Sequence, residues 1–172
     1  MIVRQEKPSD YDEVYELVKI SFATTFNDDG TTPDYLNEVR KKDTFIPELS
    51  LVAETDDGKI VGQIVLYKTD ITTSNKKITE LLLSPICVHP KYFRRRIART
   101  MIDESFRIAK QMGYKAVFLC GEPEVYRKFG FIPSYKYGIY HISDNSKNAK
   151  WSMVYELVKE GLNDITGTVD TV

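Results

Sequence analysis

The residues best suited to chemistry lie in one short stretch, ICVHPKYFRRRIART, residues 86–100. An apolar run ends there at His-Pro, and five cations follow within nine residues: Lys91, Arg94, Arg95, Arg96 and Arg99. Guanidinium groups make charge-assisted, bidentate contacts with phosphate oxygens. The periodic pattern of a helix begins inside this cluster, and a helix start adds unpaired N–H groups and a partial positive charge. The cluster therefore favours an anionic ligand, and a diphosphate group is the expected one.

The same cluster is compatible with a solvated turn, a localisation signal or a nucleic-acid patch. The whole chain of 172 residues has a net charge of −1, whereas nucleic-acid-binding domains are usually clearly basic. No apolar run approaches the ~18 residues of a membrane span. The N-terminal residues MIVRQEKPSD lack the charged-then-apolar order of a signal peptide. We therefore predict a cytoplasmic protein with neither nucleic acid nor membrane as a partner.

Composition predicts one soluble domain over residues 1–172, because 42% of the residues are hydrophobic and 28% are charged. A chain of this length buries an ordinary core without disulfides or metals. Cys87 and Cys120 each lie in an apolar, strand-like run, which predicts two buried, reduced thiols. With two histidines and no Cys/His spacing motif, we expect no metal site.

The elements that must position the basic cluster follow from hydrophobic periodicity and turn residues. The N-terminal half predicts a strand over 1–7, a helix over 8–26 and strands over 49–55 and 59–71 that are joined by the hairpin signal DDG. A short helix is expected over 32–43, with Thr32 as N-cap and Pro33 as the first helical residue.

The C-terminal half predicts a long strand over 78–90, a helix that ends at Gly113, a strand over 115–121 and a short helix over 123–129. Pro85 interrupts the first of these strands, which indicates an opening in the sheet because proline donates no ladder hydrogen bond. The helix has one apolar stripe: Ala98, Met101, Ile102, Ser105, Ile108, Ala109 and Met112. Strands over 131–140 and 150–158 close the chain, and residues from Lys159 onward receive no assignment.

The order strand–helix–strand over 78–120 implies a crossover between parallel strands, and the preceding hairpin makes the sheet mixed. Together the elements predict an α/β fold of three layers, with a central sheet of about seven strands and helices on both faces. Ligands of such sheets bind outside the carboxyl ends of the parallel strands, where the basic cluster lies.

The segment ICVHPKYFRRRIARTMIDESFRIAKQMGYKAVFLCGEPEVYRKFGFIPS resembles the core of GNAT-superfamily N-acetyltransferases. It is similar to bacterial predicted acetyltransferases that carry a GDPEYYxRFGF-like segment. The resemblance implies direct transfer of an acetyl group from acetyl-CoA to a primary amine of a small molecule or peptide. It also implies that the pantetheine arm pairs with the backbone of Ile86, Cys87 and Val88.

In this family the pyrophosphate loop has the form Gln/Arg-x-x-Gly-x-Gly/Ala, which falls on Phe93, Arg94, Arg95, Arg96, Ile97 and Ala98. Only Ala98 matches, since Phe93 replaces Gln/Arg and Arg96 replaces Gly. An arginine at 96 costs ~1–3 kcal/mol if that position needs positive φ, and nothing if it is already helical. We expect Arg94, Arg95 and Arg99 to compensate through side-chain contacts.

The resemblance places Tyr126 as the general acid toward the leaving thiolate, in contact with the cofactor. The alternative is that Val125, Tyr126 and Phe129 are simply the buried side of a short helix. The resemblance also implies a base, or a carboxylate that acts through water, on this strand, and Glu80, on the same strand face as Ser84, is the predicted one; the alternative is an exposed carboxylate at a strand start. A backbone N–H of the 86–88 strand, that of Val88, is expected to polarise the carbonyl, and His89 is interpreted as loop structure.

Two other functions stay open at this point. One is a non-catalytic, acetyl-CoA-binding regulatory module, since the pyrophosphate loop departs from the family pattern. The other is an RNA- or DNA-binding function of the arginines. The sequence leaves the acceptor amine undetermined, with specificity expected in the first helices and the 71–77 loop, and a homodimer is compatible with it.

Overall fold

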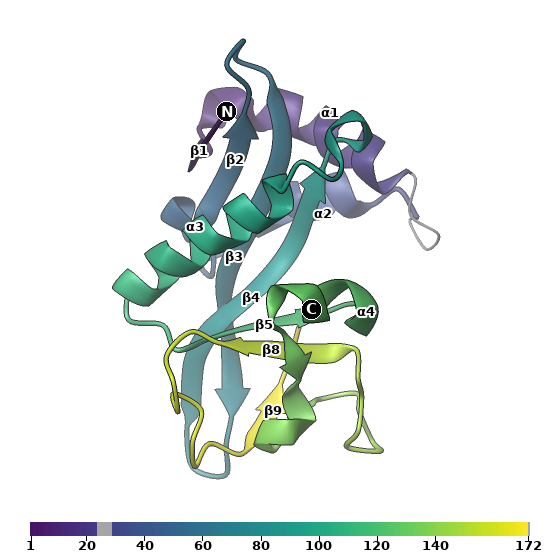
Figure 1. Cartoon of the computed structure of the whole chain (residues 1–172). Helices are drawn as coiled ribbons and strands as arrows, with labels where there is room; N and C mark the ends of the chain where they lie inside the picture. The colour runs from purple at the N-terminus through teal and green to yellow at the C-terminus, as the bar shows by residue number, and fades with distance from the viewer. Residues whose placement is uncertain (24–28, 172) are drawn as a thin grey trace. The chain divides into compact units, whose positions relative to one another are not determined.

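The computed structural model of the chain describes residues 1–23 and 29–171. It contains two compact units, Met1–Tyr67 with Ser84–Ala109 and Lys68–Leu83 with Lys110–Val172 (Figure 1). The long strands β3 (Ile60–Thr72) and β4 (Lys77–Val88) pass from one unit into the other. The single domain over residues 1–172 stays a prediction.

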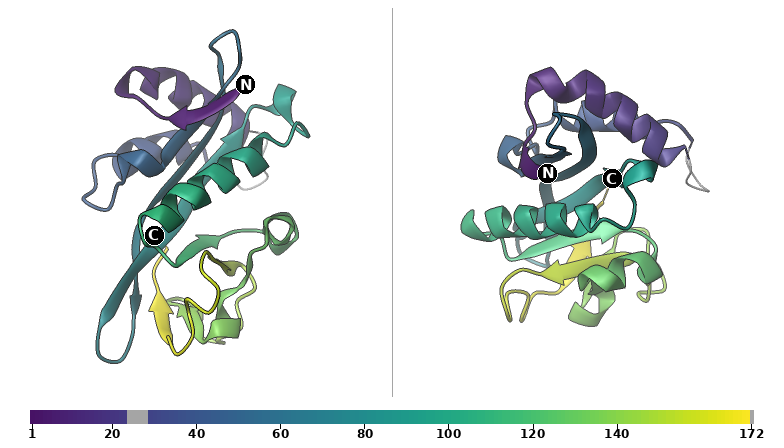
Figure 2. Two further views of the ribbon diagram at one scale, coloured as in Figure 1. Left: turned by 60° about the vertical axis from the view of Figure 1, so that its left-hand side comes forward. Right: turned by 45° about the horizontal axis from the view of Figure 1, so that its top comes forward.

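The first unit is built on strands β1 (Ile2–Gln5), β2 (Ser50–Glu54), β3 and β4, which are neighbours in that order. Helices α1 (Tyr11–Phe22) and α2 (Thr32–Val39) cover one face, and α3 (Ile97–Gln111) covers the other (Figure 2). Alternation along β3 explains both layers, because Val65 packs in a buried cluster with Val14 of α1, whereas Gly62 lies against α3. The predicted layers and the hairpin at 55–59 are confirmed.

The predicted helix ends need correction. Residues 8–10 form a 3-10 turn before α1, and residues 24–26 of the predicted first helix lie outside the described residues. The N-cap of α2 is Thr31 rather than Thr32, so Pro33 is the second helical residue. The Thr31 hydroxyl donates to Oδ1 of Asp29 and makes no capping hydrogen bond to the helix, so hydroxyl identity alone did not distinguish two adjacent threonines.

The buried side of α3 is also rotated from the predicted stripe. Its buried residues are Ile97, Met101, Ile102, Ser105, Phe106 and Ala109. Ala98 and Ile108 are only half-buried, and Met112, which follows the last helical residue, is exposed. Gly113 ends the segment with φ of +91°, as predicted.

The second unit is arranged around β5 (Ala116–Cys120). This strand pairs in parallel with β4 through Leu81–Val117, which confirms the predicted crossover, and antiparallel with β8 (Ser152–Glu156). After β5, the short helix α4 (Pro123–Tyr126) continues as a 3-10 turn to Phe129 and ends at Gly130, where φ is +94°. The short helix predicted over 123–129 is therefore confirmed.

The C-terminal strands differ from the prediction. The segment 131–140 is divided into β6 (Ile132–Pro133), a 3-10 turn (Ser134–Tyr137) and β7 (Ile139–His141). Pro133 and the left-handed Gly138 flank this turn and break the run. The unassigned tail contains β9 (Gly167–Val169), which lies between β3 and β7. The described residues thus form a nine-stranded mixed sheet rather than one of about seven strands.

Candidate active site

The end of β4 carries the three predicted backbone partners of the cofactor, residues 86–88. The side chain of Cys87 is 7% exposed and packs in the cluster under α1 and α2, whereas Ile86 and Val88 are half-buried. Burial raises the pKa of the Cys87 thiol to about 12. The thiol therefore stays protonated at neutral pH, and Cys87 can offer a ligand only its backbone groups.

The ladder of β4 has a definite register on both sides of Pro85. The parallel pairs with β5 are Leu81–Val117 and Leu82–Phe118, both of which precede Pro85 in the chain. Beyond Val88, the N–H of His89 donates to the carbonyl oxygen of Val61, 2.8 Å away, which ties the strand end to β3. The residues predicted to meet the cofactor are therefore held by their neighbour β3.

The basic turn has an unusual backbone. Arg94 and Arg96 both adopt the left-handed region, each with φ of +62°. The carbonyl oxygen of Arg96 accepts the N–H of Thr100 at 3.0 Å, so α3 starts directly after the turn. Position 96 thus requires positive φ, and the ~1–3 kcal/mol cost of a non-glycine residue applies there.

The side chains of the turn point mostly to solvent. Phe93, Arg94, Arg95 and Arg96 are exposed. The guanidinium of Arg95 lies 5.0 Å from the ring centroid of Tyr92, and Arg99 pairs with Asp103 at 3.8 Å. Across residues 1–23 and 29–171, no ion pair involves Arg94, Arg95 or Arg96. Three guanidinium groups are therefore available to an anion.

Gly62 is a positioning residue that the sequence reasoning missed. A Cβ at this position would lie 3.1 Å from Cγ2 of Ile97 and 3.0 Å from the thioether of Met101, so a larger residue would push these α3 side chains away by a few tenths of an ångström. Ile97 is 3% exposed, which leaves only its backbone for a ligand. The signal was present, since a glycine inside the apolar run IVGQIV indicates close backbone approach.

Tyr126 lies at the end of α4 in the second unit, and its ring is fixed by packing. It contacts Phe131 edge-on with 6.0 Å between ring centroids, and Phe129 at 6.5 Å. A Cβ at Gly121 would clash with the Tyr126 ring, which makes Gly121 a second missed residue. Burial raises the pKa of Tyr126, so the phenol keeps its proton at neutral pH. The described residues offer its hydroxyl no hydrogen-bond partner, and this is the state that a proton donor to a ligand needs.

The alternative explanation of α4 is only partly consistent with this packing. Phe129 and Tyr126 do pack together, but Val125 is 47% exposed and is not part of a buried side. The interpretation of the three residues as one buried helix face is therefore wrong for Val125.

Glu80 lies on β4 and is 3% exposed, so it is not an exposed carboxylate at a strand start. Its Oε2 accepts the N–H groups of Lys115 at 2.8 Å and Ala116 at 3.0 Å. Burial raises the pKa of Glu80, and these two hydrogen bonds act in the opposite direction. One oxygen thus anchors the turn between α3 and β5, which is a structural function. Its function as the general base stays a prediction.

The remaining chemistry-bearing residues have simpler surroundings. Nδ1 of His89 accepts the N–H of Lys91 at 3.2 Å, which agrees with its interpretation as loop structure. Cys120 is free, as predicted, but exposed rather than buried, because it ends β5. None of the helices in the described ranges is long and apolar enough to cross a membrane.

The family model described as an acetyltransferase (GNAT) domain matches residues 3–133. The chain belongs to the GNAT acetyltransferase family. The N-acetyltransferase YhbS of Escherichia coli K12 is 26% identical over 170 residues, which cover 99% of this chain and 95% of YhbS. The predicted GNAT family and N-acetyltransferase class are thus confirmed.

Two solved GNAT structures share the fold. YhbS from Escherichia coli in complex with CoA superposes with a TM-score of 0.85 at 24% identity, covering 99% of this chain and 89% of that one. A GNAT acetyltransferase from Brucella melitensis in complex with acetyl-CoA gives a TM-score of 0.75 at 22% identity, covering 98% and 93%. The predicted α/β fold with helices on both faces of a mixed sheet is confirmed.

Proposed function

We propose that this GNAT protein transfers the acetyl group of acetyl-CoA directly to a primary amine of a small molecule or peptide. The observation that carries the proposal is the left-handed backbone of Arg94 and Arg96 at the start of α3. The CoA and acetyl-CoA complexes of the two similar structures support the same cosubstrate.

The turn suits a diphosphate in three ways. Consecutive backbone N–H groups around left-handed residues form a concave nest that binds anions. The start of α3 adds unpaired N–H groups and a partial positive charge. The exposed guanidinium groups of Arg94, Arg95 and Arg96 add charge-assisted contacts, and Arg99 loses little by leaving its exposed pair with Asp103. In this proposal the backbone of Phe93, Ile97 and Ala98 completes the phosphate contacts.

The chemistry divides between backbone and phenol. Acetyl-CoA supplies a thioester-activated acetyl group. The backbone of Ile86, Cys87 and Val88 holds the pantetheine arm, and the Val88 N–H polarises the acetyl carbonyl. Tyr126 contacts the cofactor near its sulfur and holds a proton on its hydroxyl for the departing thiolate. The acceptor amine must either bind in its neutral form or lose a proton in the site, since amines with pKa ~10.4 are protonated at pH 7.

The general base is the least defined part of the proposal. Glu80 stays its predicted candidate, although Oε2 already accepts two backbone N–H groups. The alternative function is a non-catalytic module that binds acetyl-CoA and regulates. Cofactor binding without thiol release across amino acids, polyamines, aminoglycosides and peptides would support that alternative.

The experiment that tests the proposal measures cofactor binding by thermal shift. Acetyl-CoA and desulfo-CoA should raise the melting temperature, since a ligand that binds only the folded state stabilises it. Pantetheine, which lacks the diphosphate, should bind poorly. Replacing Arg94, Arg95 and Arg99 together by alanine should raise the Kd at low salt and change it less at high salt.

Two outcomes would contradict this site. Equal affinity for pantetheine and CoA would remove the phosphate argument. Unchanged acetyl-CoA affinity in the triple variant, together with salt-sensitive oligonucleotide binding, would favour the nucleic-acid alternative.

A cytoplasmic location belongs to the same proposal, because the free Cys87 and Cys120 suit a reducing compartment. A homodimer stays a prediction, for which sedimentation is the test.

A further inference from the structure

A cavity of about 560 Å³ lies in the second unit, between the turn of the β3–β4 hairpin and residues 163–166 before β9. Backbone hydrogen bonds fix the hairpin wall. The N–H of Thr73 donates to the carbonyl oxygen of Lys76 at 2.9 Å, and the N–H of Lys76 donates to Oγ1 of Thr73 at 3.1 Å. The cavity is thus a preformed feature of this unit.

Glu80 lines the cavity with a carboxylate that is almost completely buried. Its Oε2 accepts the two N–H groups of Lys115 and Ala116. Its Oε1 accepts no hydrogen bond from residues 1–23 or 29–171. Among the described residues, Oε1 is not one of the fully buried side-chain oxygens that lack a partner, so a ligand in the cavity can reach it, and an ammonium group is a strong donor for it.

The cavity combines both signs of charge. Lys76 and Lys115 line it together with Glu80 and Asp164, and none of these four side chains forms an ion pair with another described residue. A purely cationic ligand would meet the two lysines, and a purely anionic one the two carboxylates. A small ligand with one ammonium and one carboxylate complements both pairs.

We propose that this cavity binds a free α-amino acid. The ammonium group of the ligand donates to Oε1 of Glu80 and to Asp164, and its carboxylate pairs with Lys76 and Lys115. The amide of Asn163, which also lines the cavity, is available for a further hydrogen bond.

This site differs from the proposed acetyl-transfer site. Lys115 and Ala116 lie at the start of β5, whereas Tyr126 follows its end and packs over Gly121. A strand rises ~3.3 Å per residue, so the two ends of this five-residue strand lie roughly 13–17 Å apart. The bound amino acid is therefore not the amine that is acetylated beside Tyr126, and in this proposal Glu80 binds that amino acid instead of acting as the general base of the transfer.

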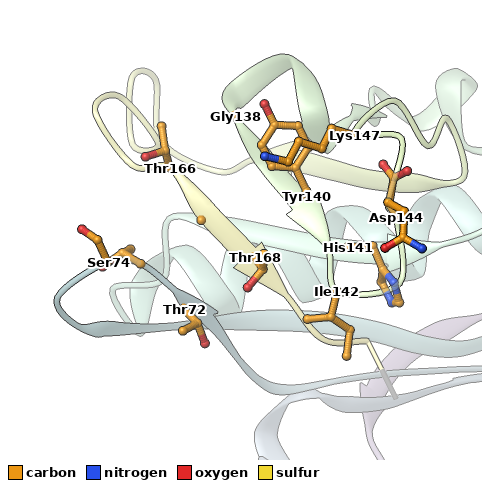
Figure 3. Close-up of a pocket in the computed structure, with 13 residues that line it drawn as sticks. Thr72, Ser74, Gly138, Tyr140, His141, Ile142, Asp144, Lys147, Thr166 and Thr168 are labelled. Atoms are coloured by element: carbon orange, nitrogen blue, oxygen red, sulfur yellow. The ribbon is translucent and has the colours of Figure 1, made fainter.

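A neighbouring groove of about 510 Å³ serves as an internal control (Figure 3). It shares Thr73, Ser74 and Thr166 with the cavity but has a different floor, the cross-strand row Thr72–Thr168–Tyr140. Figure 3 shows Lys147 extending across Tyr140, with its ammonium 5.3 Å from the ring centroid. Asp144, the carboxylate that lines this groove, is only half-buried, whereas Glu80 is almost completely buried.

The test is calorimetric titration of the full chain with glycine, L-glutamine, L-lysine and L-aspartate. At least one of them should bind, whereas its N-acetyl and amide forms, each lacking one charge, should bind about tenfold more weakly or worse. Glu80→Gln keeps an oxygen for the two backbone N–H groups but loses the negative charge. The affinity of this variant for the amino acid should therefore fall at least about tenfold. If Glu80→Gln folds poorly, Lys115→Met and Asp164→Asn provide the test, and each should weaken binding of the amino acid.

The controls separate this site from its surroundings. Tyr140→Phe and Thr168→Val change the neighbouring groove and should leave the affinity for the amino acid unchanged. Tyr126→Phe should also leave this affinity unchanged. Lost binding in Tyr126→Phe would show that the amino acid occupies the acceptor site and would overturn the proposal. Absence of binding by all four amino acids, or equal affinity for the N-acetyl and amide analogues, would also overturn it.

Discussion

A carboxylate and a phenol lie at the two ends of strand β5, and they differ in their hydrogen-bond partners. At its start, Oε2 of Glu80 accepts the N–H groups of Lys115 and Ala116. At its end, Tyr126 packs over Gly121 and against Phe131, and none of the described residues hydrogen-bonds its hydroxyl. Burial raises the pKa of both groups. A raised pKa therefore does not distinguish a structural group from a reactive one, whereas hydrogen-bond partners do.

Tyr126→Phe is expected to have the largest effect. The substitution keeps the ring contacts with Phe129 and Phe131 and removes only the hydroxyl. If this hydroxyl protonates the leaving thiolate, kcat and kcat/KM should both fall roughly 10²–10⁴-fold, with little change in acetyl-CoA affinity. A thiol-release assay and a thermal melt measure the two quantities.

The matched control is Tyr140→Phe, which removes a phenol hydroxyl elsewhere in the same unit and should leave turnover unchanged. Wild-type turnover in Tyr126→Phe would show that Tyr126 is packing alone. The contrast between the two ends of β5 would then disappear.

Gly121→Ala should disturb the same end of the strand indirectly. A methyl group at this position clashes with the Tyr126 ring, and overpacking typically costs about 1–3 kcal/mol. We expect a lower melting temperature and slower turnover, since the ring must move. In a double-mutant cycle, Gly121→Ala should cost little stability when it is made in the Tyr126→Ala protein. A cost that persists in the cycle would place the strain in the backbone rather than in the ring contact.

Glu80→Ala tests the other end of β5. It leaves the N–H groups of Lys115 and Ala116 without an acceptor, which should lower the free energy of unfolding by about 1–3 kcal/mol. Glu80→Gln, which retains an acceptor, should lose less, and its kcat should fall far less than that of Tyr126→Phe. A stable Glu80→Gln protein with a kcat loss as large as that of Tyr126→Phe would instead support the predicted base.

The smallest expected effect is the pH dependence of the same pair. Burial raises the pKa of Glu80 above its ordinary value of 4.5, so the folded state holds this proton more tightly than the unfolded state. The free energy of unfolding of the wild-type chain, relative to Glu80→Gln, should be highest below pH 4.5. It should then fall as the pH rises through the folded-state pKa. Chemical denaturation of both proteins at several pH values measures this difference in the free energy of unfolding. A difference that rises with pH would contradict the prediction.

Local patterns predicted most of the framework. The hairpin at 55–59, the crossover from β4 to β5 and the short helix ended by Gly130 each depend on turn residues and periodicity close in sequence. The division of 131–140 and the strand β9 were missed. Three residues of β9 lack a periodic signal, and the strand exists because β3 and β7 pair with it.

For the site, the sequence by itself determined the family and the position of the basic turn, and it predicted Tyr126 as the proton donor, because these depend on residue order and spacing. Only the tertiary structure decided that Arg94 and Arg96 are left-handed, that Gly121 must be small, and that one Glu80 oxygen is engaged. The Tyr126 ring that limits Gly121 is five residues away, but the partners of Glu80 lie 35 and 36 residues away. Packing and hydrogen bonds between distant segments set the environment of each group, and a linear pattern does not record which segments meet.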